Sequence, residues 1–372
     1  MNGRQLLAIG VGVLGIAAAL VLARHGKPAH ERTPALSDRA LVEFTALEPI
    51  DAHTHIFRGS PAFTRMLDHL HMHVLDILYV DDSDPYLKSI EQQRKDAFSF
   101  VESNSGHAQL CTTFDPFLLR DPNFSKNATS GLDNDFAHGA VAAKIWKNVG
   151  MEIMDASGKY ITPEEPRFDD IYRDIAAHNK TLILHVADPD EAWGIPSPWG
   201  FISKYYDANP QWNMATKRGA PSKKDILEAT DRVLARHPDL RVIGAHFGSL
   251  EDHLDELAPR LDRYPNFAVD TAARVRRLVY QPRDQVRAFF LKYQDRIIYG
   301  TDLHLFPATD ESSAPSTWEN QYSLDWRYFA TDDTFAYQGH QAQGLKLPPE
   351  VLKKLYHDNA IRWIPGLENH LH

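Results

Sequence analysis

The chain has 372 residues, 43% of them hydrophobic, so it can bury a large core as one elaborate domain or as two ordinary ones. Its 50 acidic and 40 basic residues give a net charge of -10, and no lysine or arginine run could neutralise a phosphate backbone, which excludes nucleic acid as a partner. The single cysteine, Cys111, excludes an intramolecular disulfide and a cysteine-based zinc finger. A metal site in this chain would therefore be built from carboxylates and from the 19 histidines.

The first element along the chain is an uninterrupted apolar run from Leu6 to Ala23. As a helix it would be about 27 Å long, close to the thickness of a bilayer core. We interpret residues 1–24 as a signal peptide cleaved after Ala23 or as an uncleaved membrane anchor, and we favour the anchor because Arg24 crowds the cleavage position. Both alternatives predict an exported enzyme, either periplasmic or held on the membrane with an extracytoplasmic catalytic domain. Residues 25–48 are polar and are expected to form a linker.

Residues 49–372 are predicted to form one catalytic domain, because short apolar runs alternate there with amphipathic segments. Strands are expected at residues 50–57, 74–80, 110–117, 140–146, 181–187, 241–247, 267–272 and 296–301. Helices are expected at residues 85–102, 168–178, 222–237, 250–263, 282–294 and 348–363. This pattern of eight strands, with no glycine-rich phosphate loop after the first, favours an α/β fold of the (β/α)₈ TIM-barrel type over a doubly wound open sheet.

Two connections of the predicted barrel are too long to be plain loops. Residues 188–221 follow the fifth strand and residues 303–347 follow the eighth, and both leave the carboxyl ends of strands. Each insertion is rich in aromatic residues. They are either lids over a site or insertions whose rings form a core of their own.

The strongest local signal is the sequence Asp51-Ala52-His53-Thr54-His55 at the end of the first strand. Because side chains alternate along a strand, His53 and His55 are expected to point together into the barrel, while Ala52 and Thr54 face the helices. Two imidazoles can then reach one ion at the face where barrel enzymes place their chemistry.

Three more polar residues end predicted strands in the same way: His185, His246 and Asp302. A single histidine in such a place is more often a hydrogen-bonded core residue than a ligand. Here, however, several such residues stand at strand ends that meet at one face of the barrel, and this favours ligands over core residues. Nitrogen and oxygen ligands of this kind suit zinc, and less specifically manganese, iron or nickel.

On these residues the chain resembles the amidohydrolase superfamily, and within it the amidohydrolase-related branch that includes aminocarboxymuconate-semialdehyde and resorcylate-type decarboxylases. The matching segments are residues 51–55, His185, residues 244–248, residues 300–302 and residues 357–362. The resemblance implies that His53, His55, His185 and Asp302 bind one divalent metal, with His246 nearby as a base or electrostatic partner.

The expected chemistry follows from a metal with an open coordination position, which lowers the pKa of bound water toward neutrality. Asp302 would accept the proton that the water gives up, and His246 would polarise the substrate or shuttle that proton. A hydrogen-bond donor behind the ligands is an equal alternative for His246.

Three cations are candidates for binding the substrate: Lys144 and Lys147 near the end of the fourth strand, and Arg274 after the seventh. In binuclear members of the superfamily, a carboxylated lysine at the end of strand four bridges two metals, and Lys144 stands at that position. His185 and His246 would then hold the second ion. Because the decarboxylase-like branch is generally mononuclear, we favour lysine as a cation for a substrate carboxylate.

The main functional hypothesis is a metal-dependent hydrolase that uses activated water on an ester, lactone or amide of a small molecule bearing a carboxylate or an aromatic group. It is preferred because an exported enzyme meets polymers and conjugates, and because the aromatic insertions are unlike a compact decarboxylase site. The alternative is a nonoxidative decarboxylase of an aromatic or unsaturated carboxylic acid that uses the same ligands. A non-enzymatic binding protein is less favoured, because every expected ligand is present. The number of metals and the assembly of the chain into a homo-oligomer stay open.

Overall fold

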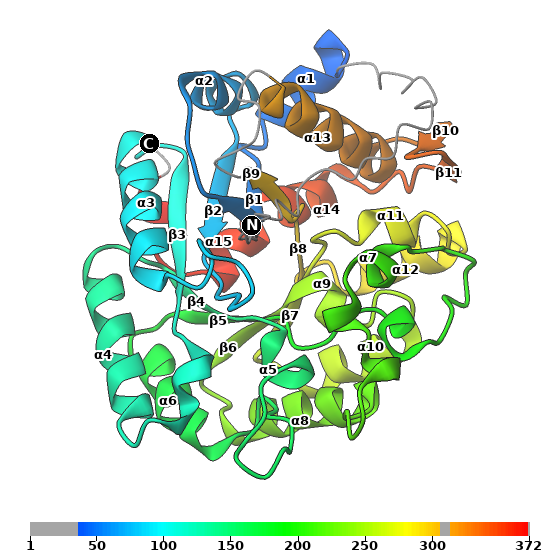
Figure 1. Cartoon of the computed structure of the whole chain (residues 1–372). Helices are drawn as coiled ribbons and strands as arrows, with labels where there is room; N and C mark the ends of the chain where they lie inside the picture. The colour runs from blue at the N-terminus through cyan, green and yellow to red at the C-terminus, as the bar shows by residue number, and fades with distance from the viewer. Residues whose placement is uncertain (1–35, 306–312, 371–372) are drawn as a thin grey trace, which may run out of the picture. The chain divides into compact units, whose positions relative to one another are not determined.

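The computed structural model describes residues 36–305 and 313–370, all within one unit, Pro34–His372 (Figure 1). The predicted signal peptide or anchor, residues 1–24, lies outside the described residues. Within the described ranges, no helix combines the length and the apolar composition that crossing a membrane requires. Almost all of the predicted catalytic domain, residues 49–372, is described.

A curled sheet of parallel strands lies at the centre of the described chain (Figure 1). The strands are β1 (Ile50–Ile56), β2 (His73–Ile77), β3 (Ala108–Thr113), β4 (Ala142–Ile145), β5 (Thr181–Leu184), β6 (Arg241–Gly244), β7 (Phe267–Asp270), β8 (Ile297–Ile298) and β9 (Leu303–Leu305). They pair in the order β8-β7-β6-β5-β4-β3-β2-β1-β9, so strands that are neighbours in the sequence are neighbours in the sheet. All eight predicted strand positions are found, with β9 continuing the last of them, and the predicted TIM barrel is confirmed.

The barrel closes where the eighth strand position meets β1. Ala52 N–H donates to the Tyr299 carbonyl (3.0 Å), and Asp302 N–H donates to the His53 carbonyl (2.8 Å). Between these two bonds lies Gly300, where an added Cβ would be only 2.8 Å from the Cβ of His53. Glycine is therefore needed at this position, since a side chain would separate the two strands. The close approach brings Asp302 beside His53.

Helices surround this sheet, and most pairs of consecutive strands are connected by at least one of them (Figure 1). The longer ones are α1 (Asp38–Thr45), α2 (Pro61–Leu70), α3 (Ile90–Ser103), α4 (Phe124–Ala137), α6 (Asp169–Ala177), α8 (Lys223–Arg236), α10 (Leu254–Arg263), α12 (Arg283–Lys292) and α13 (Ala314–Ala330). The helices predicted between strands correspond to α3, α6, α8, α10 and α12. The last predicted helix is found as α14 (Pro349–Lys353), a π-helical turn and α15 (Asn359–Trp363).

Several of the helices, among them α1, α2 and α4, were not predicted. Helix α4 contains serine, threonine, asparagine and glycine, which have low helix propensity, yet it buries Phe124, Leu132 and Phe136. Helix α1 lies inside the segment predicted as a linker. It begins at a cap in which the Ser37 hydroxyl accepts from a backbone N–H, and it buries Phe44. In both cases tertiary packing stabilises the helix.

A β-bulge in β1 changes the orientation predicted for Ala52. Between Asp51 and Thr54 the register of β1 against β2 shifts by one residue, so β1 has an extra residue at this point. Ala52 lies in the apolar cluster inside the barrel, and the prediction that it faces the helices was wrong. The bulge lets Ala52 and His53 both point inward although they are adjacent in the sequence.

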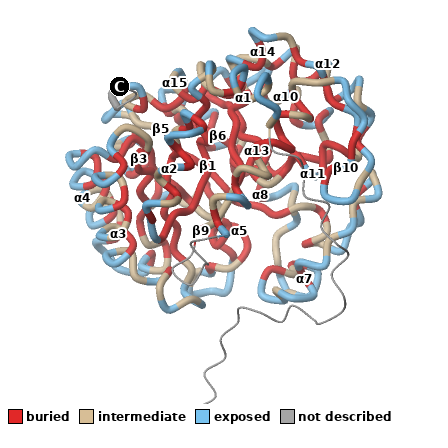
Figure 2. Tube along the Cα trace, turned by 90° about the horizontal axis from the view of Figure 1, so that it is seen from above, coloured by how far each residue is buried: buried red, intermediate tan, exposed pale blue. Residues whose placement is uncertain are grey.

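The apolar interior of the barrel is filled at one end by the C-terminal helix α15. Strand residues contribute a ring of small and branched side chains, namely Ile50, Leu75, Ile77, Cys111, Ala142, Ile183, Ile243, Ala268 and Ile298. Trp363 packs into this cluster and is 4% exposed, and its indole N–H donates to the Asp295 carbonyl (3.0 Å). Its own carbonyl accepts from the hydroxyl of Thr181, the first residue of β5, so the helix closes the amino-terminal end of the strands. Figure 2 shows the strands as the buried centre of the described chain.

The aromatic rings of the insertion at residues 303–347 join the large apolar cluster that also contains Phe44 and Phe63, rather than forming a core of their own, which was one of the two expectations for it. Helix α13 buries most of them: Trp318, Tyr322, Trp326 and Tyr328. Trp326 meets Phe44 of α1 at 5.4 Å between ring centroids, and Trp318 meets Phe63 of α2 at 4.8 Å. A hairpin of β10 (Thr334–Tyr337) and β11 (His340–Gln343) follows α13. Most of this insertion therefore packs outside the barrel.

Asp76 on β2 should make the stability of the protein pH-dependent. One carboxylate oxygen accepts from Ile56 N–H (2.8 Å), the other has no hydrogen-bond partner among the described residues, and burial raises the pKa of Asp76 from 3.8 to about 8. Between these two values the folded chain holds a proton that the unfolded chain releases. The free energy of unfolding should therefore fall as pH rises through this range, by at most about 1.4 kcal/mol per pH unit, and level off above the folded pKa.

The Asp76→Asn variant tests this pH dependence in urea unfolding curves followed by circular dichroism. We expect the variant to be more stable than the wild type at about pH 9 and to lose part of the pH slope. Asp51 and Asp325, whose pKa values burial raises to about 7 and about 6, contribute in the same direction in both proteins. Stability curves that run parallel across this pH range would contradict the prediction.

Candidate metal centre

The candidate ligands come from strand ends at the carboxyl face of the barrel, as predicted. His53 and His55 lie on β1, His185 follows β5, His246 follows β6, and Asp302 stands between β8 and β9. His246 (φ 59°) and Asp302 (φ 64°) both adopt the left-handed backbone conformation. For a non-glycine residue this conformation costs about 1–3 kcal/mol and is concentrated at functional sites. Here it turns the two side chains toward the same centre.

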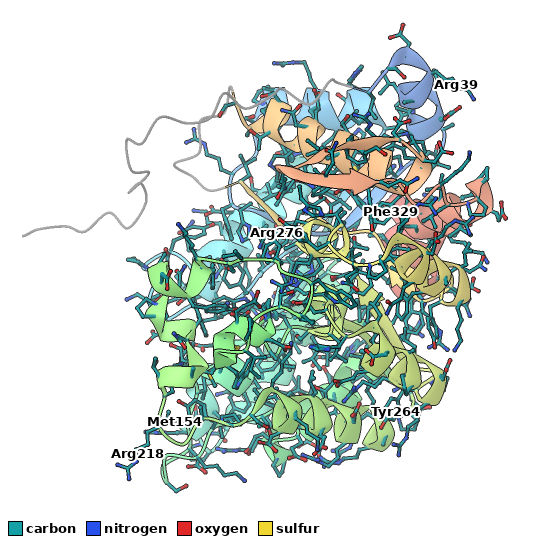
Figure 3. The ribbon with its side chains drawn as sticks, turned by 90° about the vertical axis from the view of Figure 1, so that its right-hand side faces the viewer. Arg39, Met154, Arg218, Tyr264, Arg276 and Phe329 are labelled. Atoms are coloured by element: carbon teal, nitrogen blue, oxygen red, sulfur yellow. The ribbon has the colours of Figure 1, made fainter. Side chains whose placement is uncertain are left out.

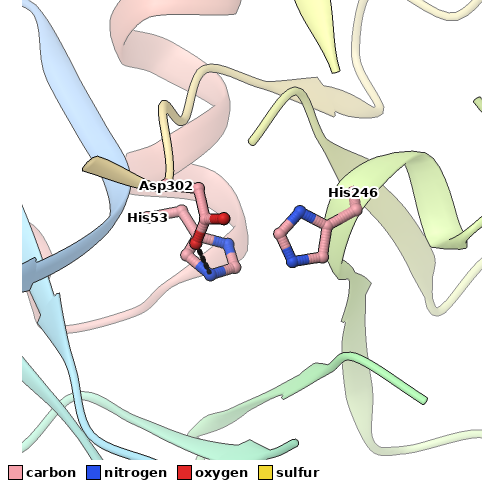
Figure 4. A group of neighbouring side chains, drawn as sticks. All are labelled: His53, His246 and Asp302. Atoms are coloured by element: carbon pink, nitrogen blue, oxygen red, sulfur yellow. Dashed lines mark ion pairs between the residues drawn. The ribbon is translucent and has the colours of Figure 1, made fainter. Parts of the chain in front are cut away.

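The Asp302 carboxylate lies at the centre of the arrangement. Its Oδ1 atom is 3.3 Å from Nε2 of His55 and 3.6 Å from Nε2 of His53. His53, His246 and Asp302 each offer a ligand atom, and these atoms lie within 4.8 Å of one another (Figure 4). The same is true of His55, Asp302 and His304. Distances of this order allow a divalent ion to be bound after small shifts of the side chains.

Hydrogen bonds orient the imidazoles toward this centre. His55 Nδ1 donates to the Ile77 carbonyl (2.6 Å), and His246 Nδ1 donates to the Ala272 carbonyl (2.8 Å). His53 Nδ1 lies 2.7 Å from Oδ2 of the buried Asp270. Because carbonyl and carboxylate oxygens accept, the proton of each ring resides on Nδ1 and the lone pair is on Nε2. This is the arrangement that histidine ligands of metals adopt, so the residues present fit a divalent metal.

The charges of the centre reflect its burial. Burial alone would raise the pKa of Asp302, but His246 and the neighbouring histidines outweigh that effect and hold it well below its usual value. Burial lowers the pKa of His246 well below its usual value, and the nearby His185 and Arg274 lower it further. The histidines around Asp302 thus favour its carboxylate form, while burial disfavours a charged His246 ring.

His185 lies next to His246, outside the two groups of ligand atoms described above. Its Nε2 atom is 3.3 Å from Oδ1 of Asp188, and its ring lies 4.2 Å from the His246 ring between centroids. It belongs to neither group of three ligand atoms. His185 thus stays a predicted ligand, and His246 takes the place beside His53 and Asp302.

The three predicted substrate cations have different surroundings. Lys144 is fully buried and its Nζ lies 3.1 Å from Nε2 of His53, inside the centre, where burial lowers the pKa of the lysine. Lys147 forms an ion pair with Asp188 (2.8 Å). Its ammonium also lies over the rings of Trp146, Tyr205 and Trp212. Arg274 is buried, with Nε 3.3 Å from Oε1 of Glu251.

Sequence reasoning missed two residues of the centre. Asp270 ends β7 as the other polar residues end their strands, and that position was its signal. His304 lies two residues after Asp302 on β9, and the strand period could have indicated a shared side. The first residue of the Asp51-to-His55 motif has a different role, since its carboxylate accepts from the backbone N–H (3.0 Å) and the hydroxyl (2.6 Å) of Thr301. Asp51 thereby fixes the segment that carries Asp302.

Comparison with known proteins identifies the family. The sequence model of the amidohydrolase family matches residues 50–365. The chain belongs to the amidohydrolase family. This confirms the resemblance to the amidohydrolase superfamily and its amidohydrolase-related branch, and it makes the protein an enzyme of that superfamily.

Solved structures resemble the fold of this amidohydrolase at low sequence identity. A putative amidohydrolase from Staphylococcus aureus is 13% identical with a TM-score of 0.51, and the match covers 85% of this chain and 99% of that one. A 2,6-dihydroxybenzoate decarboxylase from Rhizobium is 14% identical with a TM-score of 0.48, covering 84% and 98%. A dihydroxybenzoic acid decarboxylase from Polaromonas, solved with bound manganese, is 13% identical with a TM-score of 0.47, covering 85% and 96%. No curated protein matches the chain.

Replacing Asp270 with asparagine should weaken metal binding by about 10- to 100-fold, because removal of a partner that orients a metal-binding histidine typically has this effect. The amide can present its NH₂ group to His53 Nδ1 and so favour the wrong tautomer. Metal affinity can be measured by titration of the metal-free protein.

Asp135→Asn is a matched control for this variant. Asp135 is equally buried, at 1% exposed, but it binds Arg94 (2.7 Å) away from the centre. The control should lose stability and keep its metal affinity. Equal metal affinity in Asp270→Asn and the wild type would contradict the orienting role of Asp270.

Proposed function

We propose that this amidohydrolase is a metal-dependent hydrolase that cleaves an ester, lactone or amide bond in a small molecule bearing a carboxylate or an aromatic group. One observation carries the proposal: the Nε2 lone pairs of His53, His55 and His246 face the Asp302 carboxylate while their Nδ1 protons are bound elsewhere. The three imidazole rings and the carboxylate thus act as acceptors toward the centre. Such a set can hold a cation and take up a proton, and hydrolysis requires both.

His53, His55 and Asp302 would hold the ion, with His185 as the further predicted ligand. A nitrogen and oxygen set of this kind is most compatible with zinc. When bound, such an ion supplies Lewis acidity, which polarises a carbonyl group and lowers the pKa of water. Asp302 accepts the proton that the attacking water loses, because its carboxylate is the central acceptor of the site. His246, whose ligand atom lies within 4.8 Å of those of His53 and Asp302, can relay that proton to the leaving group.

The second candidate function is nonoxidative decarboxylation, and Lys144 is the observation that favours it. In that reaction the bond between the carboxylate and the substrate carbon breaks, carbon dioxide leaves, and the electron pair left on carbon takes a proton. The reaction therefore needs a proton donor in the site. The Lys144 ammonium, 3.1 Å from His53 Nε2, is such a donor. The same metal ligands serve both reactions.

Product analysis distinguishes the two reactions. The purified protein is assayed for divalent metal and then incubated with a panel of aryl esters, lactones and amides and a panel of hydroxylated aromatic acids. Hydrolysis gives products that together gain the mass of one water, whereas release of carbon dioxide with loss of one carboxylate would overturn the hydrolase proposal. Absence of stoichiometric divalent metal, or activity that survives removal of the metal by a chelator, would overturn both.

We also propose that the enzyme acts outside the cytoplasm, because residues 6–23 form an apolar run long enough to span a bilayer. N-terminal sequencing of the protein recovered from native membranes tests this. An intact N-terminus in the membrane fraction supports an anchor, and a start near residue 24 in the soluble exported fraction supports a signal peptide. Recovery in the cytoplasm would overturn the proposal.

A further inference from the structure

A cavity of about 250 Å³ opens beside Asp302. The segment after β7 contributes Arg274 and Arg276 to its lining, and the insertion after β8 contributes His304, Gln321 and Tyr337. The cavity is thus continuous with the candidate metal centre through Asp302 and His304. Its small volume favours a compact ligand of the size of a single ring over a polymer chain.

The three arginines that follow β7 differ in their partners. Arg274 is held by Glu251, as described above. Arg277 is buried and forms ion pairs with Glu191 (3.0 Å) and with Asp252. Arg276 is exposed and forms no ion pair with any residue in the described part of the chain. It is therefore the cation of this segment whose charge is available to a ligand.

Arg276, which is labelled in Figure 3, lies near residues of both insertions. Its guanidinium carbon is 5.8 Å from the ring centroid of Phe201, which belongs to the insertion after β5. Gln321 and Tyr337, from the insertion after β8, line the same cavity. A ligand bound to Arg276 would thus also contact residues that a simple barrel lacks.

The opposite wall of the cavity is held by its own hydrogen bonds. Gln321 Nε2 donates to Oδ1 of Asp325 (2.9 Å) and lies 2.8 Å from the Tyr337 hydroxyl, which itself donates to Asp325 (2.6 Å). Gln338 Nε2 donates to Oε1 of Gln321 (3.1 Å). Asp325 is 1% exposed, and its oxygens are occupied by these donors and by the Tyr299 hydroxyl. The wall is preformed and leaves Arg276 as the group that can receive an anion.

We propose that Arg276 binds a carboxylate group of the substrate in this cavity and so places the reacting bond beside Asp302. A guanidinium presents parallel N–H donors that match the two oxygens of a carboxylate. The inference rests on the proposed function and narrows its substrate class to small carboxylic acids whose free carboxylate is not the group that reacts. Arg276 takes this role in place of Arg274 and Lys147, since both of those cations are already paired inside the protein.

The first test measures binding and needs no turnover. Binding of benzoate is measured by calorimetry to the metal-loaded wild type and to Arg276→Gln. We expect the substitution to weaken binding by about 10- to 100-fold, the effect of losing a hydrogen bond to a charged group. Arg218→Gln is the matched control, because Arg218 is also an exposed arginine and lies far from Arg276 on the face shown in Figure 3. Equal affinity of Arg276→Gln and the wild type, or no binding of benzoate to the wild type, would overturn the role of Arg276.

The second test separates the role of Arg276 from the proposed reaction. Turnover of an ester that carries a remote carboxylate is compared with turnover of the matching uncharged ester. The loss of kcat/KM in Arg276→Gln should be at least about tenfold larger for the charged ester, with an intermediate loss in Arg276→Lys. Equal losses on both esters would overturn the proposal. If neither ester is hydrolysed by the wild type but benzoate binding depends on Arg276, the hydrolase proposal fails and the anion site stands.

Discussion

Asp302→Asn should lower kcat by about 100- to 10,000-fold, the range that a general acid or base contributes, and should also remove most of the bound metal. Asparagine has nearly the same shape, so it can keep the backbone hydrogen bond to the His53 carbonyl while it loses the charge. That charge is the acceptor at 3.3 Å from His55 and 3.6 Å from His53. Metal content by mass spectrometry and turnover of an identified substrate measure the two effects.

Asp239→Asn is the control for the substitution of Asp302. Asp239 is exposed in the turn before β6, at the other end of the barrel, and the same chemical change there should leave metal content and kcat unaltered. Full metal content with full turnover in Asp302→Asn would show that the carboxylate is neither ligand nor base. Full metal content with low turnover would assign it the role of base alone.

Trp363→Ala should lower the free energy of unfolding by about 3–5 kcal/mol, the effect of replacing a buried tryptophan with alanine. Trp363 fills the amino-terminal end of the barrel and is 4% exposed, so its removal leaves a cavity among the strand side chains. The substitution also leaves the Asp295 carbonyl without the indole donor. Urea unfolding followed by circular dichroism measures the change without relying on tryptophan fluorescence.

Two further variants check that the effect at Trp363 arises from packing. Trp363→Phe keeps part of the ring and should destabilise the protein less than alanine does. Val42→Ala, at a side chain that is 67% exposed on α1, should change the free energy of unfolding by less than about 0.5 kcal/mol. A Trp363→Ala variant as stable as the wild type would mean that α15 does not close the barrel.

The order of the strands could be predicted from the sequence because it depends on short-range patterns. Apolar runs between turn residues identify each strand, and consecutive parallel strands joined by helices pair with one another in a closed barrel. Helices with a clear apolar face, such as α8, were predicted for the same reason. Helix α4 and helix α13 were not, since their positions depend on partners elsewhere, such as Phe63 and Phe44 for the rings of α13.

The candidate site was only partly predictable from the same patterns. The pair His53 and His55 follows from the strand period, and both histidines point inward. The period failed at Ala52, because a β-bulge shifts the register between Asp51 and Thr54 and no local signal marks it. The nearness of Asp302 to His53 depends on Gly300, where two strands approach too closely for a side chain.

Tertiary structure alone decides which of the arginines after β7 can bind a ligand. The sequence shows Arg274, Arg276 and Arg277 as similar residues in one segment, and three-dimensional contacts with distant acidic residues distinguish them. Arg277 pairs with Glu191, which is 86 positions away in the sequence, and Arg274 lies against Glu251. Ion pairs across such separations leave no periodic signal, so the sequence could not show that Arg276 is the arginine without such a partner.

The sequence by itself determined the barrel, the family and the strand ends that carry His53, His55, His185, His246 and Asp302, because strand periodicity and motif spacing are local properties of the chain. Tertiary structure decided how those side chains meet: it placed His246 beside His53 and Asp302, added Asp270 and His304, and buried Lys144 in the centre. The physical reason is that hydrogen bonds and burial among distant segments set the direction and charge of each side chain.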